Sequence, residues 1–336
     1  MNDRALRLLE QYDLEVTATR RGRGSYILET TDGLRIFSDY SNSENKAVFQ
    51  NLVMEKLREG GYGHVDRILA DKEGNLTVRD WEDNRYVVKE WYTGRECDTS
   101  SEHEILAAVS NLARIHRLMQ LDPGERSTEE DQPGVYMSVP DPLQEIRAQN
   151  AELRKIRSFI RRRNDKGLFE RQFLQCFDQY YTQAEEAEQY LEVLQSPLKI
   201  CWNRHPGSVC HGDYDHHNIL MSGYEMATIN FNRCRIDFQV NDLYRFMRKI
   251  LEKQEWNLKL ADKMLDGYMR VKPLPEAERK LLYVKMLYPE KFRKLANYYY
   301  GSNKAWISRR FLDKLENING QNEIRRNFVK MFGLNI

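Results

Sequence analysis

The sequence lacks an excess of charge, a long apolar segment and paired cysteines. Lys and Arg number 52 against 51 Asp and Glu, so the net charge is +1 and gives no bulk attraction to nucleic acid or to a membrane surface. No apolar run approaches 18 residues and the first residues form no signal peptide, so we expect cytoplasmic synthesis and no membrane-spanning segment. The five cysteines are odd in number and include no C-x-x-C pair, which argues against a disulfide framework or a zinc site.

The most informative segment runs from His211 to Asn218. It has the H-x-D-x-x-x-x-N spacing that is typical of the catalytic loop of kinase-type phosphotransferases. In such a loop the Asp accepts the hydroxyl proton of the phosphate acceptor, and the Asn holds a magnesium ion. His211, His216 and His217 could instead form a transition-metal cluster, but the catalytic-loop spacing accounts for the same residues better.

The pattern of apolar residues predicts an α+β protein with two lobes. Short strands around one helix are expected over residues 1–92, and a large, mainly helical lobe is expected over residues 93–336. The stripe from Ile105 to Leu118 has helical spacing, and further helices are predicted over 142–163, 169–194, 242–255, 258–269 and much of the chain after 276. Residues 121–134 are polar and rich in turn formers, as in a linker.

The surroundings of the His211 segment favour the kinase interpretation. A short apolar run, 208–210, precedes it, and two strands, 219–221 and 226–229, follow it with a turn at 222–224. In kinases the second of these strands ends in the D-F-G aspartate, which binds the magnesium that bridges the phosphates.

These residues resemble the aminoglycoside phosphotransferase and choline kinase superfamily and, within it, the CotS-type spore coat proteins of endospore-forming bacteria. The matching segments are Gly94-Arg-Glu-Cys-Asp98, Cys210-His-Gly-Asp-Tyr214 with His217-Asn218, Ile229-Asn-Phe231, Asp242-Leu-Tyr-Arg-Phe-Met-Arg-Lys249 and Tyr288-Pro-Glu-Lys-Phe292. The resemblance implies a bilobal protein-kinase-like fold with the catalytic-type loop at 211–218.

The resemblance also implies roles for individual residues. Asp213 would be the catalytic base and Asn218 a magnesium ligand, while Asp242 would support the backbone of the loop and His211 would be structural. The hinge, 87–92, would line the adenine side of the nucleotide site, with the cofactor-binding residues Val88, Glu90, Trp91 and Tyr92.

Two positions depart from the pattern of an active kinase. The D-F-G aspartate is replaced by Asn230, twelve residues from both Asn218 and Asp242, and an amide lacks the charge that Mg²⁺ favours in its ligands. Asp237, nineteen residues after Asn218, is the alternative metal ligand. Ser38 falls where an active kinase has a phosphate-binding lysine, and no lysine occurs before Lys46.

The sequence therefore predicts a CotS-like spore coat protein that is a pseudokinase or a weakly active phosphotransferase. We expect it to assemble onto the spore coat and to bind other coat proteins, with a vestigial nucleotide pocket or no cofactor, and with no nucleic acid or membrane as partner. The alternative is an active small-molecule kinase that uses ATP and Mg²⁺, with Asp213 as its base.

Overall fold

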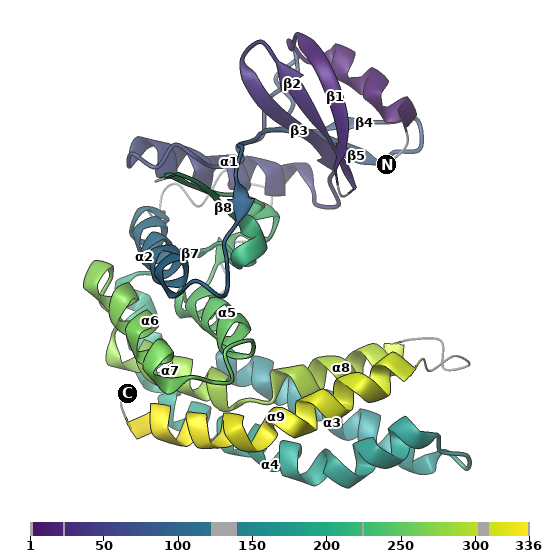
Figure 1. Ribbon diagram of the computed structural model, residues 1–336, viewed down its shortest axis with the longest axis vertical. Helices are drawn as coiled ribbons and strands as arrows, with labels where there is room; N and C mark the ends of the chain where they lie inside the picture. The colour runs from purple at the N-terminus through teal and green to yellow at the C-terminus, as the bar shows by residue number, and fades with distance from the viewer. Residues whose placement is uncertain (1–2, 23, 122–139, 224, 302–308, 335–336) are drawn as a thin grey trace. The chain divides into compact units, whose positions relative to one another are not determined.

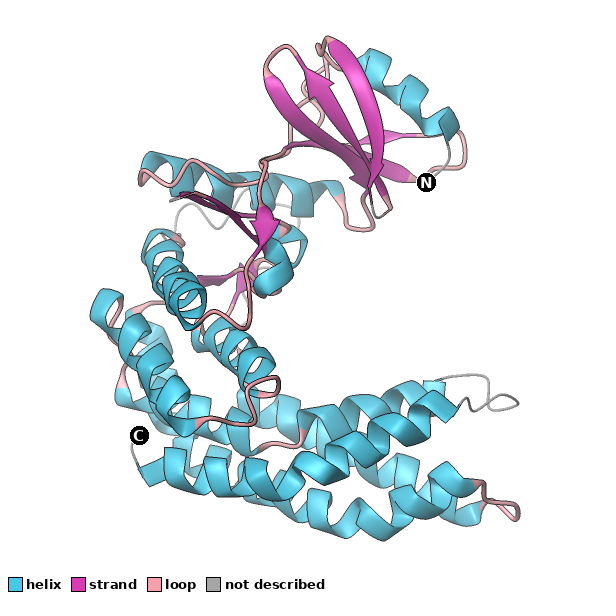
Figure 2. Ribbon diagram, viewed as in Figure 1, coloured by secondary structure: helices cyan, strands magenta, loops and turns pink. Residues whose placement is uncertain are grey.

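The computed structural model describes residues 3–22, 24–121, 140–223, 225–301 and 309–334 (Figures 1 and 2). The chain divides into two compact units. The first consists of Met1–Met137, Gly207–Phe246 and Arg270–Lys272, and the second of Ser138–Pro206, Met247–Met269 and Pro273–Ile336. The loop from His211 to Asn218 thus belongs to the same unit as the N-terminal strands. A lobe boundary at residues 92 and 93 stays a prediction.

The first unit is built on an antiparallel sheet with the strand order β1-β2-β3-β5-β4. Its strands are β1 (Val16–Gly22), β2 (Ser25–Thr30), β3 (Gly33–Asp39), β4 (Val78–Arg79) and β5 (Arg85–Glu90). A tight turn at Thr31-Asp32 joins β2 to β3, because Thr30 pairs with Gly33. Gly33 has a φ of 108°, which few other residues tolerate.

A helix packs on each face of this sheet. Successive side chains of a strand point to opposite faces, so neighbouring residues contact different helices. One face, with Phe37 and Val88, packs on the 3₁₀ helix η1 (Asp3–Gln11), which the sequence analysis did not predict. Val87, which points the other way, packs with Tyr40 and with Ala47 of α1 (Glu44–Glu59). Lys89 therefore points to the α1 side of the sheet.

The same unit holds the segments around the loop. The helix α2 (Glu102–Leu118) precedes them, and α5 (Val240–Leu251) begins in this unit. β7 (Val209–Cys210) pairs with β10 (Arg235–Ile236), and β8 (Ile219–Ser222) pairs with β6 (Arg95–Glu96) and β9 (Glu225–Thr228). The short 3₁₀ helix η2 (His216–Asn218) ends the loop, and η3 (Phe231–Arg233) follows β9. The predicted turn at 222–224 includes Tyr224, which lies outside the described residues.

The second unit is helical. Its helices are α3 (Pro142–Arg162), α4 (Leu168–Arg204), most of α6 (Leu258–Val271), α7 (Glu276–Leu287), α8 (Glu290–Gly301) and α9 (Arg309–Leu334). Phe292 of α8 stacks on Phe173 and Tyr180 of α4, with ring centroids 5.0 and 4.3 Å apart. These buried rings supply much of the apolar area that holds the helices together. Residues 122–134 of the expected linker lie outside the described residues.

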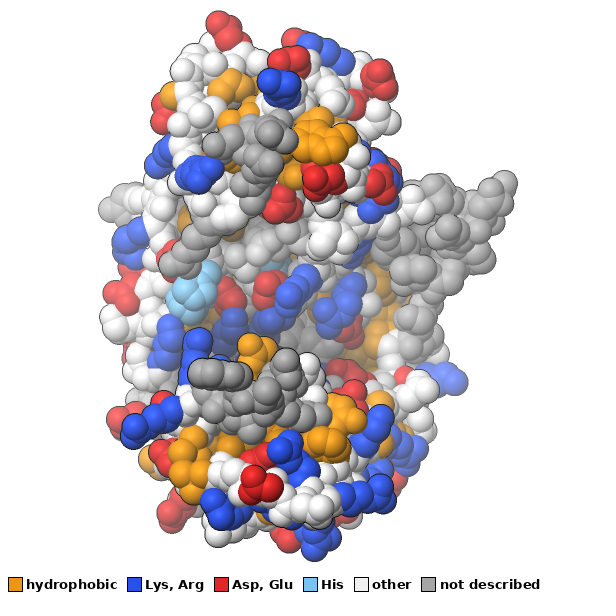
Figure 3. All heavy atoms as spheres, turned by 90° about the vertical axis from the view of Figure 1, so that its right-hand side faces the viewer, with side chains coloured by type: hydrophobic (Ala, Val, Ile, Leu, Met, Phe, Trp, Pro, Cys, Tyr) orange, Lys and Arg blue, Asp and Glu red, His pale blue; other side chains and the backbone are white. Residues whose placement is uncertain are grey.

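The surface carries charges of both signs. Positive and negative side chains lie side by side on the face drawn in Figure 3, in keeping with the net charge of +1. Among the helices of the described ranges, none combines the length and the apolar character that crossing a bilayer requires.

Candidate functional site

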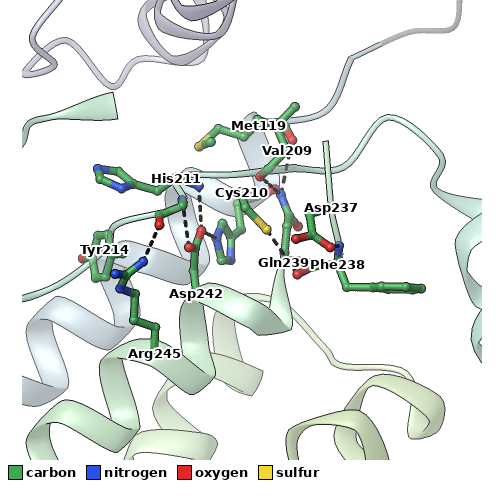
Figure 4. Close-up of polar contacts among 12 residues, drawn as sticks. Met119, Val209, Cys210, His211, Tyr214, Asp237, Phe238, Gln239, Asp242 and Arg245 are labelled. Atoms are coloured by element: carbon green, nitrogen blue, oxygen red, sulfur yellow. Dashed lines mark hydrogen bonds and ion pairs between the residues drawn. The ribbon is translucent and has the colours of Figure 1, made fainter. Parts of the chain in front are cut away.

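The backbone at the start of the loop is held by Asp242 (Figure 4). Its Oδ2 accepts a hydrogen bond from the backbone N–H of His211 at 2.6 Å, and its Oδ1 accepts one from that of Gly212 at 2.9 Å. His116 of α2 approaches the same carboxylate with its Nε2 at 3.2 Å. Asp242 is 2 % exposed, so each of these contacts is shielded from water.

These hydrogen bonds decide the ionisation of the cluster. Burial alone would raise the pKa of Asp242, but hydrogen bonds from His116 and from the loop backbone outweigh it and lower that pKa below its ordinary value. Burial lowers the pKa of His116, so the imidazole is neutral and Asp242 carries the charge.

Among the described residues, both ring nitrogens of His211 contact backbone groups. Its Nδ1 accepts a hydrogen bond from the N–H of Asp213 at 3.1 Å, so its Nε2 carries the proton and donates to the carbonyl of Ile229 at 3.0 Å. Burial lowers its pKa, in agreement with a neutral ring. His211 thus connects the loop to Ile229, the residue that follows β9.

The carboxylate of Asp213 is engaged by a guanidinium. Arg245 of α5 places its Nη2 2.9 Å from Oδ1 of Asp213, and its Nη1 donates to the carbonyl of Gly212 at 2.5 Å. Both side chains remain partly exposed, at 26 % for Arg245 and 20 % for Asp213. The contact with Arg245 uses Oδ1 of the carboxylate.

Three asparagine amides form a chain of hydrogen bonds that begins at the end of the loop. Asn230 donates through Nδ2 to Oδ1 of Asn218 at 3.3 Å, and it accepts at Oδ1 from Nδ2 of Asn232 at 3.0 Å. Asn218 in turn donates to the carbonyl of Asp213 at 2.8 Å. Asn230 has a φ of 69°, a left-handed conformation that asparagine adopts more readily than most residues. The amide oxygens of Asn218 and Asn230 are therefore used within the protein.

A lysine from a different strand reaches this chain. Lys89 of β5 donates through Nζ to Oδ1 of Asn232 at 2.6 Å and pairs with Oδ2 of Asp66 at 3.0 Å. Lys89 and Asp66 are 3 % and 1 % exposed. In the sheet, Ser38 pairs with Val87, and Ile36 pairs with Lys89. Paired residues share a face and so do residues two apart, so Lys89 and Ser38 lie on the same face of the sheet. A phosphate-binding lysine was expected only on the third strand, so Lys89 was not among the predicted site residues.

The expected hinge residues have different surroundings. The side chain of Val88 is buried in the core beside η1, and that of Glu90 forms ion pairs with Arg58 and Arg67. Trp91 and Tyr92 pack against a small apolar cluster that consists of Leu220, Ala227 and Ile229. Of the expected nucleotide-binding residues, these two aromatic side chains present the apolar surface that a base would need.

The remaining candidate residues form their polar contacts with groups outside the asparagine chain. Asp237 pairs with Arg235 at 2.6 Å and accepts a hydrogen bond from the N–H of Phe238 at 2.8 Å. Asp215 caps η2, and His217 contacts Glu96 at 2.6 Å. Within the described ranges, no group of three or more His, Cys, Asp or Glu side chains is placed to hold a metal ion.

The site does not fit the magnesium ion that kinases use. Mg²⁺ is bound mainly by carboxylate, phosphate and water oxygens, whereas Asn218 and Asn230 offer neutral amides that bond to one another. Asp213, the carboxylate joined to this chain through its backbone, is paired with Arg245.

The fold is that of known antibiotic kinases. The aminoglycoside phosphotransferase from Alicyclobacillus acidocaldarius is 19 % identical, with a TM-score of 0.78, and the match covers 97 % of this chain and 94 % of that one. Spectinomycin phosphotransferase APH(9)-Ia, in complex with ADP and spectinomycin, is 11 % identical with a TM-score of 0.60 over 99 % and 94 % of the two chains. Amicoumacin kinase hAmiN, in complex with AMP-PNP and Ca²⁺, is 14 % identical with a TM-score of 0.59 over 97 % and 94 %.

No curated protein matches the sequence significantly. A family model, described as that of the spore coat putative kinase YutH, matches residues 6–332, nearly the whole chain. The fold expected from the loop motif and the resemblance to spore coat proteins are both confirmed by these matches. The chain belongs to the YutH family of spore coat kinase-like proteins.

Proposed function

We propose that this protein is a kinase-fold component of the spore coat that transfers phosphate weakly or not at all and acts by binding other coat proteins. Membership of a spore coat family supports the location. The observation that supports weak or absent phosphate transfer is the amide of Asn230, which bonds to Asn218 and Asn232. We assign Asn230 to the position where an active kinase needs a carboxylate on magnesium.

The missing charge is costly for metal binding. Two unit charges about 4 Å apart attract by about 4 kcal/mol at an effective dielectric constant near 20, and the divalent ion doubles the charge on one side. A neutral amide gives up most of this attraction.

The second candidate is an active kinase for a small molecule, with ATP and Mg²⁺ as cofactors. The observation in its favour is the well-ordered loop, in which Asp242 and His211 hold the backbone beside Asp213. In that case Asp213 would be the base, and Asn218 with either Asn230 or Asp237 would hold the metal. Asn230→Ala and Asp237→Ala would then separate the two metal assignments, because only one of them should abolish turnover.

The proposal is tested in spores that lack the native protein. The strain is complemented with the wild-type chain or with Asp213→Asn, which removes the base and keeps the size of the side chain. We expect equal incorporation into the coat and equal spore resistance with both chains. Loss of either property with Asp213→Asn, at the same level of folded protein, would show that phosphotransfer is needed.

A further inference from the structure

Lys89 and the asparagine chain contain hydrogen-bond donors that acceptors in the described part of the chain do not fully occupy. We propose that this site binds the phosphate groups of a nucleoside triphosphate without a divalent cation, with Lys89 as the phosphate-binding cation. This inference rests on the proposed function, since it describes what a kinase site without metal ligands can still hold.

Lys89 has a donor to offer. An ammonium group has three N–H bonds, and two of these point to Asp66 and Asn232. The amide of Asn230 likewise has two N–H bonds, of which one is donated to Asn218. Both groups belong to one chain of hydrogen bonds, in which Asn232 accepts from Lys89 and donates to Asn230.

The electrostatics of the site suit an anion that arrives without metal. A carboxylate at position 230 would repel phosphate oxygens unless a metal ion lay between them, whereas an amide can donate a hydrogen bond to them. The two carboxylates that remain are each paired with a cation, Asp66 with Lys89 and Asp213 with Arg245. The replacement of Asp by Asn therefore removes a need for magnesium as well as a means of binding it.

The register of the sheet explains how Lys89 can take the place of the missing lysine. It lies on the strand beside Ser38 and on the same face, and its long side chain ends at Asn232, two residues after Asn230. A lysine on the third strand of an active kinase holds the α- and β-phosphates. The aromatic side chains of Trp91 and Tyr92 lie against the apolar cluster at Leu220 and favour a nucleoside over phosphate alone.

The experiment is a thermal-unfolding titration with ATP in EDTA, repeated with Mg²⁺ and with inorganic tripolyphosphate. At a concentration one hundred times the dissociation constant, ATP should stabilise the protein by about 2.7 kcal/mol, a clear rise in the melting temperature. We expect this rise in EDTA, little further change with Mg²⁺ and a smaller rise with tripolyphosphate. A rise only with Mg²⁺, or no rise at all, would overturn the inference, and an equal rise with tripolyphosphate would overturn its nucleoside part.

Asn230→Asp gives the sharper test, since Asn230 is partly exposed and the change is nearly isosteric. In EDTA this variant should bind ATP at least tenfold more weakly than the wild type, and Mg²⁺ should restore the affinity. Asn203→Asp, the same change at an exposed position of α4, is the matched control and should bind like the wild type. Equal binding by Asn230→Asp in EDTA would contradict the inference.

Replacing Lys89 needs a partner change, because Lys89→Met alone would leave Asp66 buried and unpaired. The double variant Lys89→Met with Asp66→Asn should fold and lose the rise in EDTA, and a folded double variant that keeps it would overturn the role of Lys89. Failure of metal-free binding would leave the proposed non-catalytic role intact. Turnover by the wild type would refute that role whatever the result in EDTA.

Discussion

The nearly isosteric substitution Asp242→Asn should strongly lower the free energy of unfolding of the protein. The carboxylate accepts hydrogen bonds from the N–H groups of His211 and Gly212 and from the ring of His116. An Asn has one acceptor oxygen, and its NH₂ group must face at least one of these donors. A buried donor without a partner costs about 1–3 kcal/mol, and a hydrogen bond that loses its charged acceptor weakens by about 1 kcal/mol.

One unpaired donor and two weakened contacts together lower the free energy of unfolding by about 4 kcal/mol. The assay is urea denaturation followed by circular dichroism, with hydrogen exchange of the peptide that contains His211 and Gly212 as a local readout. Asp266→Asn, at an exposed position of α6, is the control and should change stability by less than about 0.5 kcal/mol. A loss below about 1 kcal/mol for Asp242→Asn, with unchanged exchange, would refute the account of the loop.

Two further predictions concern the same region. Gly212→Ala should destabilise the protein more than Gly74→Ala: both residues have positive φ, at 80° and 92°, but only at Gly212 would the new Cβ meet a backbone oxygen, 2.1 Å away. Equal losses in urea denaturation would contradict this clash. Stability should also fall as the pH drops below about 6.5, because burial lowers the pKa values of His116 and His211 and the unfolded chain then takes up more protons than the folded one. The stabilising contribution is complete above pH 6.5 or so and decreases by up to about 1.4 kcal/mol per pH unit for each histidine, so equal urea midpoints at pH 7.5 and 5.5 would speak against two buried neutral rings.

The fold and the position of the catalytic-type loop could be predicted from the sequence, because the patterns that indicate them lie within short segments. The spacing of His211, Asp213 and Asn218 and the helical stripe from Ile105 to Leu118 lie within single segments. The strand pair around the turn at 222–224 was also predicted, and it places Asn230 two residues after the end of β9 and beside Asn218.

The origin of the site's cation could not be predicted in this way. Lys89 reaches Asn232 across 143 positions of sequence, and which face of β5 carries it depends on the pairing with β3. The ion pair of Arg245 with Asp213 likewise joins a helix to a loop, and a sequence motif does not show which charged side chains meet. The helix η1 was missed although Ala5, Leu8 and Leu9 lie at helical spacing and pack on the sheet.

The most direct measurement is the release of ADP from ATP and Mg²⁺ by the wild-type protein and by Asp213→Asn, with water and with a panel of small molecules that carry hydroxyl or amino groups. The account predicts that the two proteins release ADP at the same background rate with every acceptor. Turnover by the wild type that Asp213→Asn abolishes would contradict it and would make this protein an active kinase.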